Sequence, residues 1–314
     1  MPILTFAPRA WGRLVLASIL TFGLAAGAAA QTRDRVIVAS KIDTEGALLG
    51  HMIALVLEKA GVPVESRVQL GPTKVVRTAL LSGEVDLYPE YTGNGAFFHN
   101  MENDPAWKAA ASAFETVRRL DREKHNLVWL DRAPANNTWL IATRADLAKR
   151  ERLATMEDFA RLSKQAGAIK LAGSAEFVES AAALPSFERV YDFKLPREQI
   201  VVLPGGDTAV TMRAAAQGVS GVNAAMVYGT DGAIAALDLV VMEDTKGAQI
   251  VYEPAPVVRA DVLQRFPAIQ PALAKVFATL TMSRLQGLNA QIAVEGKPAR
   301  DVAKAYLEGE GLLR

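Results

Sequence analysis

The strongest constraint on the fold is a regular alternation of apolar runs and amphipathic segments near the start of the chain. Three runs have the composition of buried strands: Arg35–Ser40, Val64–Leu70 and Val85–Leu87. Between them, residues 44–57 and 74–81 carry apolar side chains at helical spacing, and Thr44 is predicted to cap the first of these helices. This order predicts a βαβαβ unit with a parallel sheet and right-handed crossovers.

The ends of these strands carry the first candidate site residues. Lys41 and Tyr91 follow the carboxyl ends of two predicted parallel strands, where open α/β sheets bind their ligands. Tyr91 belongs to Tyr88–Asn94, which combines two tyrosines, a carboxylate and a Gly-flanked Asn. Taken alone, this segment favours a simpler interpretation, in which Pro89 closes the strand and the tyrosines pack in the interior. Residues elsewhere in the chain therefore decide whether Tyr88–Asn94 contacts a ligand or only packs in the interior.

A second domain is predicted inside the first. Residues 104–123 predict one long helix, and the polar connector Arg132–Trp139 then leads into a new series of strands and helices. The chain returns at Val251–Arg259 and is helical from there to its end. We expect residues 31–135 and 243–314 to form a discontinuous domain I and residues 136–242 to form domain II. This predicts a two-lobed α/β fold with a ligand cleft at a hinge.

The N-terminus has the pattern of a secretory signal peptide. Arg9 and Arg13 precede an apolar segment up to about Leu24, and Ala28–Ala30 complete a small-residue cleavage site. The apolar core is shorter than the roughly 20 residues that a membrane span needs. We expect cleavage after about Ala30 and export of the mature chain. The chain has no cysteine, which excludes a lipid anchor and thiolate chemistry, and a periplasmic location follows as the expectation.

Composition and motifs argue against several function classes. A formal net charge of +1 points to neither nucleic acid nor an anionic membrane surface. His51, His99 and His125 have no metal-ligand spacing, and no hydrolase, metalloprotease or phosphate-loop motif occurs. The Gly205–Thr208 segment is interpreted as a turn before a capped helix, with Asp207 or Thr208 as the cap. The sequence thus predicts no enzyme, no cofactor and no metal.

Four aromatic residues stand at predicted strand ends or domain crossings: Tyr91, Trp139, Tyr228 and Tyr252. Singly, each is better explained as packing than as a ligand contact. Together, with two from each lobe, they describe a cage for a quaternary ammonium group, which is held by cation–π attraction because it has no N–H to donate. Each contact is worth about 0.5 to 2 kcal/mol, so three or four support a micromolar ligand.

Five segments carry a resemblance to a known family. They are Ala39–Glu45, Gly83–Gly93, Pro134–Thr138, Tyr228–Gly232 and Ala255–Arg259, and they occur in the family's order. The chain resembles the periplasmic glycine betaine/carnitine/choline-binding proteins of osmoprotectant ABC importers, most of all the osmotically induced branch with weak betaine binding. The resemblance implies a hinge-closing binding protein that serves a membrane permease.

The resemblance also implies roles for individual residues. Tyr91, Trp139, Tyr228 and Tyr252 match the aromatic cage, and Lys41 matches a basic residue near the ligand carboxylate. Asn94 stands where several relatives carry Thr, and Asn137 lies beside the cage. Ser180 stands where relatives often have an Arg that helps to hold the carboxylate, so betaine affinity is expected to suffer unless Arg213 or another residue supplies the charge.

Several alternatives stay open at this point. The ligand is expected to be glycine betaine or a related osmoprotectant, with choline or a polar amino acid as alternatives. An amino acid would need an acid for its ammonium, for which Glu90, Asp43 and Asp231 are candidates. An exported enzyme on the same fold and a partner-binding signalling or chaperone-like protein are further alternatives. We expect a monomer that closes about residues 134–139 and 231–252 when ligand binds.

Overall fold

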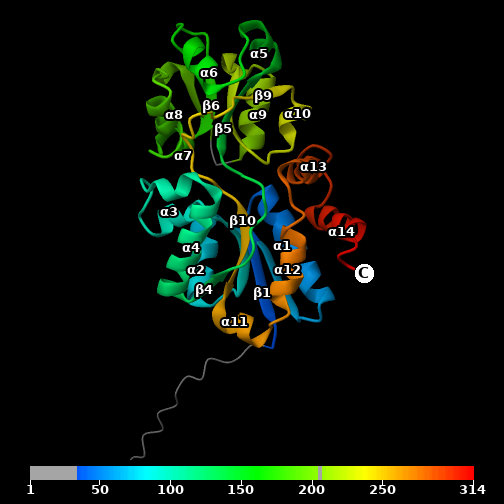
Figure 1. The fold of residues 1–314 in the computed structure, drawn as a ribbon. Helices are drawn as coiled ribbons and strands as arrows, with labels where there is room; N and C mark the ends of the chain where they lie inside the picture. Colours follow the sequence, from blue (N-terminus) through cyan, green and yellow to red (C-terminus); the bar gives the residue numbers. More distant parts are fainter. Residues whose placement is uncertain (1–33, 204–206) are drawn as a thin grey trace, which may run out of the picture. The chain divides into compact units, whose positions relative to one another are not determined.

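The computed structural model describes residues 34–203 and 207–314, and Asp34–Arg314 form one compact unit. This unit contains two five-stranded sheets with helices packed on them (Figure 1). The predicted signal peptide, residues 1–30, lies outside the described residues, as do Gly205 and Gly206 of the predicted turn. Asp207 does cap the helix after that turn, because its side chain accepts a hydrogen bond from the Ala209 N–H.

The first sheet has the strand order β2-β1-β3-β10-β4. Its strands are β1 (Val36–Lys41), β2 (Val64–Gly71), β3 (Leu87–Tyr91), β4 (Leu127–Trp129) and β10 (Pro254–Arg259). The prediction of a parallel β1–β2–β3 unit is correct, and β10 runs antiparallel to both β3 and β4. Strands from the two ends of the chain therefore share one sheet, and their ends carry Lys41 and Tyr91.

The boundary of β3 differs from the sequence prediction. Tyr88, Pro89, Glu90 and Tyr91 belong to the strand rather than to a loop after Leu87. Pro89 lies directly opposite Pro256 of β10. A proline has no N–H to donate, so two opposed prolines fit only at a non-hydrogen-bonded position of an antiparallel ladder. Pro89 thus does not close the strand, which continues to Tyr91.

Helices α1 (Thr44–Lys59), α2 (Thr73–Ser82), α3 (Asn94–Phe98) and α4 (Ala110–His125) accompany the first sheet. The cap of α1 is Asp43 rather than Thr44, since the Asp43 carboxylate accepts a 2.7 Å hydrogen bond from the Gly46 N–H. Asp43 has the extended backbone conformation of a cap residue, whereas Thr44 is already helical. The cap therefore fixes the first turn of α1 beside the end of β1.

The long helix predicted over residues 104–123 is broken. A short 3₁₀ turn, η1 (Pro105–Lys108), is separated from α4 by Ala109, whose backbone is extended. Asp104 caps the 3₁₀ turn, and the Trp107 indole N–H donates to the Met101 carbonyl, which holds the turn in place. Apolar spacing could not reveal this break, because buried residues lie on both sides of it, Trp107 before Ala109 and Val117 after it.

The second sheet has the order β7-β6-β8-β5-β9. Its strands are β5 (Trp139–Arg144), β6 (Leu171–Ser174), β7 (Ile200–Leu203), β8 (Ala224–Tyr228) and β9 (Leu239–Val241). Its helical segments are α5 (Ala145–Glu151), α6 (Met156–Ser163), α7 (Ala175–Glu179), α8 (Leu184–Val190), η2 (Arg197–Gln199), α9 (Thr208–Ala216), η3 (Val219–Gly221) and α10 (Ala233–Ala236). All of these strands come from the middle of the chain.

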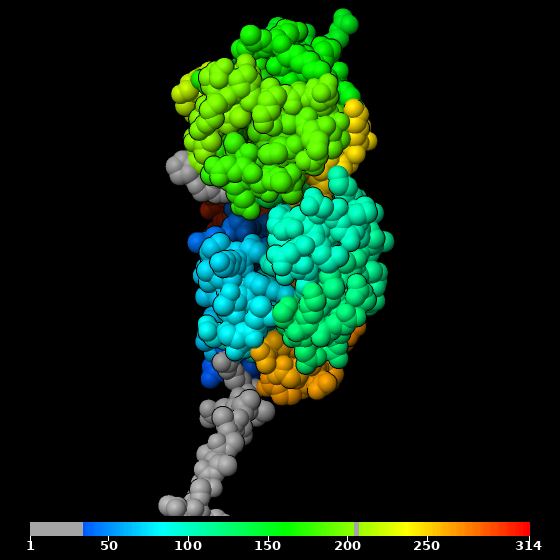
Figure 2. All heavy atoms as spheres, turned by 90° about the vertical axis from the view of Figure 1, so that its left-hand side faces the viewer, coloured from blue at the N-terminus to red at the C-terminus, as the bar shows by residue number. Residues whose placement is uncertain are grey.

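Four helices follow β10: α11 (Ala260–Arg265), α12 (Ile269–Phe277), α13 (Met282–Ala293) and α14 (Ala299–Gly309). Helices α12, α13 and α14 pack on α1, and α13 also contacts α10. Figure 2 shows late-chain residues lying against early-chain residues, while the middle of the chain groups by itself. Within residues 34–203 and 207–314, no helix is both long and apolar enough to cross a membrane.

Candidate functional site

Three of the predicted cage residues form an aromatic corner, made of Trp139, Tyr228 and Tyr252. Trp139 begins β5 and lies directly opposite Tyr228, which ends β8, so both side chains emerge on the same face. Their rings stack with centroids 6.4 Å apart, and the Tyr252 ring meets Trp139 edge-on at 6.0 Å. Phe177 supports the Trp139 ring from behind at 6.4 Å.

Tyr91 and Tyr252 are brought together at the adjacent ends of β3 and β10. Tyr91 pairs with Pro254, and the Thr92 N–H donates to the Glu253 carbonyl. The Tyr252 ring lies on the backbone of Gly93, where a Cβ atom would stand only 2.8 Å from the ring. Glycine at this position therefore permits the close approach that places Tyr252 beside Tyr91.

The two segments that join the sheets are tied to each other at this place. The Asn137 N–H donates to the Tyr252 carbonyl, and the Tyr252 N–H donates to the Asn136 side chain, both at 2.8 Å. The Thr138 hydroxyl donates to the Ile250 carbonyl at 2.7 Å. The Trp139 and Tyr252 side chains are thus held at the crossing by backbone bonds as well as by ring packing.

A buried carboxylate lies behind Tyr91. Glu45 Oε1 accepts hydrogen bonds from the Tyr91 hydroxyl at 2.8 Å and from Asn137 Nδ2 at 3.1 Å. Glu45 Oε2 accepts from Asn289 Nδ2 at 2.7 Å, and the same amide donates to the Thr230 carbonyl. Burial raises the pKa of the Glu45 carboxyl, and the hydrogen bonds from Thr230, Tyr91 and Asn289 oppose that rise.

Lys41 and Asn94 both converge on Glu90. Lys41 Nζ lies 2.5 Å from Glu90 Oε1 and stands over the Tyr91 ring, 4.6 Å from its centroid. Asn94 Nδ2 donates to the same oxygen at 2.7 Å, while the Tyr88 hydroxyl donates to Glu90 Oε2 at 2.8 Å. The Lys41 charge is therefore neutralised by a fully buried partner, and the Asn94 amide already has an acceptor.

Four polar atoms of the cluster are buried without a hydrogen bond among the described residues: Trp139 Nε1, Tyr252 Oη, Asn137 Oδ1 and Asn289 Oδ1. The Trp139 indole N–H lies near the Tyr228 hydroxyl, where it opposes the rise that burial causes in the Tyr228 pKa, but it makes no hydrogen bond of normal geometry. Burial also raises the pKa of Tyr252. Unsatisfied buried groups are costly in a folded protein, so these two donors and two acceptors suit a polar ligand or water.

Acidic side chains dominate the electrostatics of the cluster. After burial, the charges of Glu45 and Asp43 raise the pKa of Tyr91, and those of Glu176, Asp43 and Asp231 raise the pKa of Tyr228. Burial raises the pKa of Asp231 to about 7. A site surrounded by carboxylates favours a cation over an anion.

All seven predicted site residues therefore lie in one connected cluster, although their work as ligand contacts stays a prediction. The sequence analysis also considered Ser180 and Arg213 as positions that bear on binding of the ligand carboxylate. Ser180 ends α7, and its hydroxyl accepts only from the Ala182 N–H. Arg213 is exposed on α9 and borders a small hollow with residues of α10 and α13, none of them a predicted site residue.

Sequence reasoning did not find Glu45, Thr230 and Asn289. Glu45 stands in the Ala39–Glu45 segment that carries the resemblance, but it was given no role there, because an acid in the first turn of a helix is common. Asn289 lies 244 positions further along the chain, in a helix with no motif. Glu90 was considered only as a partner for the ammonium of an amino acid, and the structure pairs it with Lys41.

The histidines that showed no metal-ligand spacing in sequence do come together with an acid in space. His99, His125 and Asp121 offer ligand atoms within 4.8 Å of one another. Asp121 already accepts hydrogen bonds from Arg77, Trp129 and His99. Because the Arg77 guanidinium binds both carboxylate oxygens, it occupies their lone pairs and repels a metal cation. This cluster is an internal ion pair.

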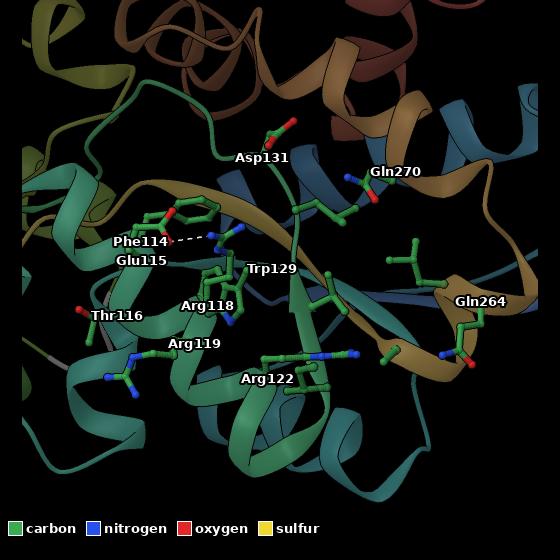
Figure 3. Close-up of a pocket in the computed structure, with 15 residues that line it drawn as sticks. Phe114, Glu115, Thr116, Arg118, Arg119, Arg122, Trp129, Asp131, Gln264 and Gln270 are labelled. Atoms are coloured by element: carbon green, nitrogen blue, oxygen red, sulfur yellow. Dashed lines mark hydrogen bonds and ion pairs between the residues drawn. The ribbon is translucent and has the colours of Figure 1, made fainter.

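A hollow of about 830 Å³ lies elsewhere, along β4 at the edge of the first sheet (Figure 3). Figure 3 shows Arg122 extending across β4 and Arg119 pointing away from it. Residues of α4, β4, α11 and α12 line the hollow, and none of the seven predicted site residues is among them. Arg118 and Arg119 are paired with Glu115 and Glu123. The aromatic cluster is therefore separate from this surface.

A two-sheet α/β fold with an aromatic and acidic cluster at the crossing of the sheets defines a solute-binding protein. The chain belongs to the family described as the substrate binding domain of the ABC-type glycine betaine transport system, whose model matches residues 34–309. Proteins of this family bind a substrate for transport and are not enzymes. The predicted family, fold class and general function are thus confirmed.

Individual relatives agree with this assignment. The glycine betaine-binding protein YehZ of Escherichia coli is 53% identical over 312 residues, which are 99% of each chain. The ergothioneine transport permease/ergothioneine binding protein EgtU of Helicobacter pylori is 28% identical over 278 residues, 88% of this chain and 48% of that protein. A solved structure of apo YehZ from Escherichia coli is 56% identical and superimposes with a TM-score of 0.74, covering 89% of this chain and 100% of that one.

Proposed function

We propose that this chain captures a quaternary ammonium osmoprotectant, such as glycine betaine, and delivers it to the membrane permease of an ABC transporter. The observation that carries the proposal is the aromatic corner of Trp139, Tyr228 and Tyr252 beside Tyr91 and the buried Glu45. Electron-rich ring faces bind a trimethylammonium group, and nearby carboxylates favour its charge. The 53% identity to a glycine betaine-binding protein supports the same ligand class.

Choline is the second candidate, and the pairing of Lys41 favours it. A betaine carries a carboxylate, which needs a cation or several hydrogen-bond donors. Lys41, the predicted partner for that carboxylate, is neutralised by Glu90, and Ser180 stands in place of an arginine. A betaine carboxylate must therefore rely on donors such as the Trp139 indole and the Tyr252 hydroxyl, whereas choline has only a hydroxyl to satisfy.

We further propose that residues 31–135 with 243–314 form one lobe, that residues 136–242 form the other, and that residues 134–139 and 231–252 act as the hinge. The membership of the two sheets supports this division. Since Tyr91, Trp139 and Tyr252 are buried and Tyr228 is half-buried, ligand entry requires the lobes to separate, and ligand binding selects the closed state. In this proposal the mature chain is a periplasmic monomer, released by cleavage after about Ala30.

Calorimetric titration of the mature protein tests the proposal. The panel is glycine betaine, choline, carnitine, proline betaine and ergothioneine, with proline and glutamate as controls that lack a trimethylammonium group. We expect heat and an increased melting temperature from at least one quaternary ammonium compound and none from the two controls. Binding of a control alone, or of no compound, contradicts the proposed ligand class. Gel filtration with light scattering tests the monomer.

A further inference from the structure

The Glu45 carboxylate has no cationic partner among residues 34–203 and 207–314. Its side-chain donors are all neutral: the Tyr91 hydroxyl, the Asn137 and Asn289 amides, and the Thr230 hydroxyl. Every other buried acid described above has a cation or a backbone N–H beside it, as Glu90 has Lys41 and Asp121 has Arg77. Glu45 is 4% exposed, so solvent screens its charge only weakly.

An ionised carboxylate in such a position is costly unless a positive charge comes close to it. The raised pKa of Glu45 expresses this cost, and the neighbouring Asp43 raises it further. The charge of Glu45 also raises the pKa of Asp231, on the turn after β8. Lys41 lies over the Tyr91 ring but is held by Glu90. The unmatched negative charge of Glu45 thus lies against Tyr91 and Asn137, and the Asn137 N–H binds the carbonyl of Tyr252 in the aromatic corner.

We propose that Glu45 is the charge-selecting residue of this site, because its carboxylate, acting through the Tyr91 hydroxyl, makes the aromatic corner prefer a permanently cationic ligand to a neutral molecule of the same shape. The inference rests on the proposed function and adds the residue that sets the charge preference. Glu45 is a positioning and electrostatic residue, since its hydrogen bonds go to Tyr91 and Asn137 rather than to Trp139, Tyr228 or Tyr252.

Two physical effects produce the preference. A phenol that donates to a carboxylate carries more electron density in its ring, which strengthens cation–π attraction at that ring. The carboxylate also attracts the ligand cation directly across a medium of low dielectric constant. The position of Lys41 Nζ, 4.6 Å from the Tyr91 centroid, shows that this ring already accepts one cation on a face. Both effects vanish when Glu45 loses its charge.

The test uses two pairs of ligands that differ only in charge at one atom. Choline is compared with 3,3-dimethylbutan-1-ol, and glycine betaine with 3,3-dimethylbutanoate; in each second compound a carbon replaces the ammonium nitrogen. Glu45→Gln keeps the shape and most hydrogen bonds but removes the charge, while Glu45→Asp keeps the charge and shortens the reach. Glu58→Gln, an exposed position on the same helix, is the matched control.

We expect Glu45→Gln to weaken binding of the cationic members on the order of tenfold and to leave the carbon analogues within about twofold. Glu45→Asp should keep the wild-type preference for the cationic member even if both affinities fall, and Glu58→Gln should match the wild type. An equal loss for both members of a pair in Glu45→Gln, or no loss at all, overturns the inference while the proposed function stands. A wild-type protein that binds none of the five quaternary ammonium compounds overturns both.

Discussion

Trp139 and Tyr228 face each other across the β5–β8 ladder, and their rings stack at a centroid distance of 6.4 Å. Trp139 begins β5 and Tyr228 ends β8, so the stacked rings lie at the end of the second sheet, where they pack against its core. The ladder fixes the backbone on both sides of the pair. The rings can therefore bind a ligand with little loss of conformational entropy.

Truncation of the corner should remove binding without unfolding the protein. We expect Trp139→Ala and Tyr228→Ala each to weaken binding of the best quaternary ammonium ligand by at least about tenfold, because each change deletes a cation–π face. Calorimetry measures the loss, and circular dichroism checks the fold. Tyr306→Ala, on α14 far along the chain from the cluster, is the control and should bind normally. Unchanged affinity in both corner variants would contradict the cage.

Substitutions of two glycines, Gly232 and Gly287, test how tightly α13 packs on the turn after Tyr228. A Cβ atom at Gly232 would lie 2.1 Å from the Ala290 backbone nitrogen and 2.5 Å from the Gln286 carbonyl oxygen. Gly232→Ala should lower the free energy of unfolding by about 1 to 3 kcal/mol, because backbone atoms cannot yield to the new methyl group. Urea unfolding measures the change.

The matched control is Gly287→Ala in α13 itself, where a Cβ atom meets nothing within 4 Å. Alanine there should raise the stability by about 0.5 to 1 kcal/mol through its better helix propensity. The two substitutions are chemically identical, so opposite signs are the expected result. Equal effects would mean that α13 does not hold the turn.

Asp231 should give the protein a pH-dependent stability. Burial raises its pKa from 3.8 to about 7, so between these values the folded protein keeps a proton that the unfolded chain has lost. The free energy of unfolding contributed by Asp231 is therefore highest below about pH 4 and falls as the pH rises to about 7. Asp231→Asn should flatten this part of the profile, because the amide stays neutral and its oxygen can still accept from the Tyr228 N–H.

Urea unfolding of both proteins at several pH values between about 4 and 8 measures the effect. The variant should gain stability over the wild type as the pH rises. Glu45, whose pKa is also raised, is expected to leave a residual slope in the same direction. Parallel profiles for the two proteins would show that Asp231 titrates as an ordinary exposed acid.

The Arg77–Asp121 pair should be a major determinant of stability. Arg77 of α2 donates to both oxygens of Asp121 of α4 at 2.8 and 2.5 Å, and both side chains are buried. Asp121→Asn leaves the buried guanidinium without its countercharge and should cost about 3 to 5 kcal/mol. Glu115→Gln, which breaks the exposed pair with Arg118, should change the stability by less than about 1 kcal/mol. A similar cost for both variants would contradict this account.

The sequence was most informative where a short-range pattern governs the structure. The alternation of strands and helices placed Lys41 and Tyr91 at strand ends, because parallel strands in a βαβ unit share the direction of their carboxyl ends. The prediction of the end of β3 was wrong at Pro89. Proline is acceptable there because it lies opposite Pro256, which comes from a distant part of the chain. Strand limits depend on such partners, and a single segment does not contain them.

The candidate site shows the same limit more clearly. The four aromatics could be singled out by their positions at strand ends and crossings. The pairing of Lys41 with Glu90 and the bond from Asn289 to Glu45 depend on long-range packing, across 49 and 244 positions respectively. These two contacts set the charge balance of the cluster. The sequence suggested that Lys41 offers a basic site for a ligand carboxylate. In the structure Lys41 is paired with Glu90, and Glu45 is an acid without a cationic partner among the described residues.

The position of Trp139 gives this protein a built-in optical probe. The chain has four tryptophans: Trp11 lies in the predicted leader, and Trp107 and Trp129 are buried in the core of the first sheet. Trp139 alone among the described tryptophans stacks on Tyr228 at the crossing. Occupancy of the corner should thus appear in the ultraviolet emission of the unlabelled protein, and Trp139→Phe should silence that signal, which makes stopped-flow measurement of ligand capture possible without a dye.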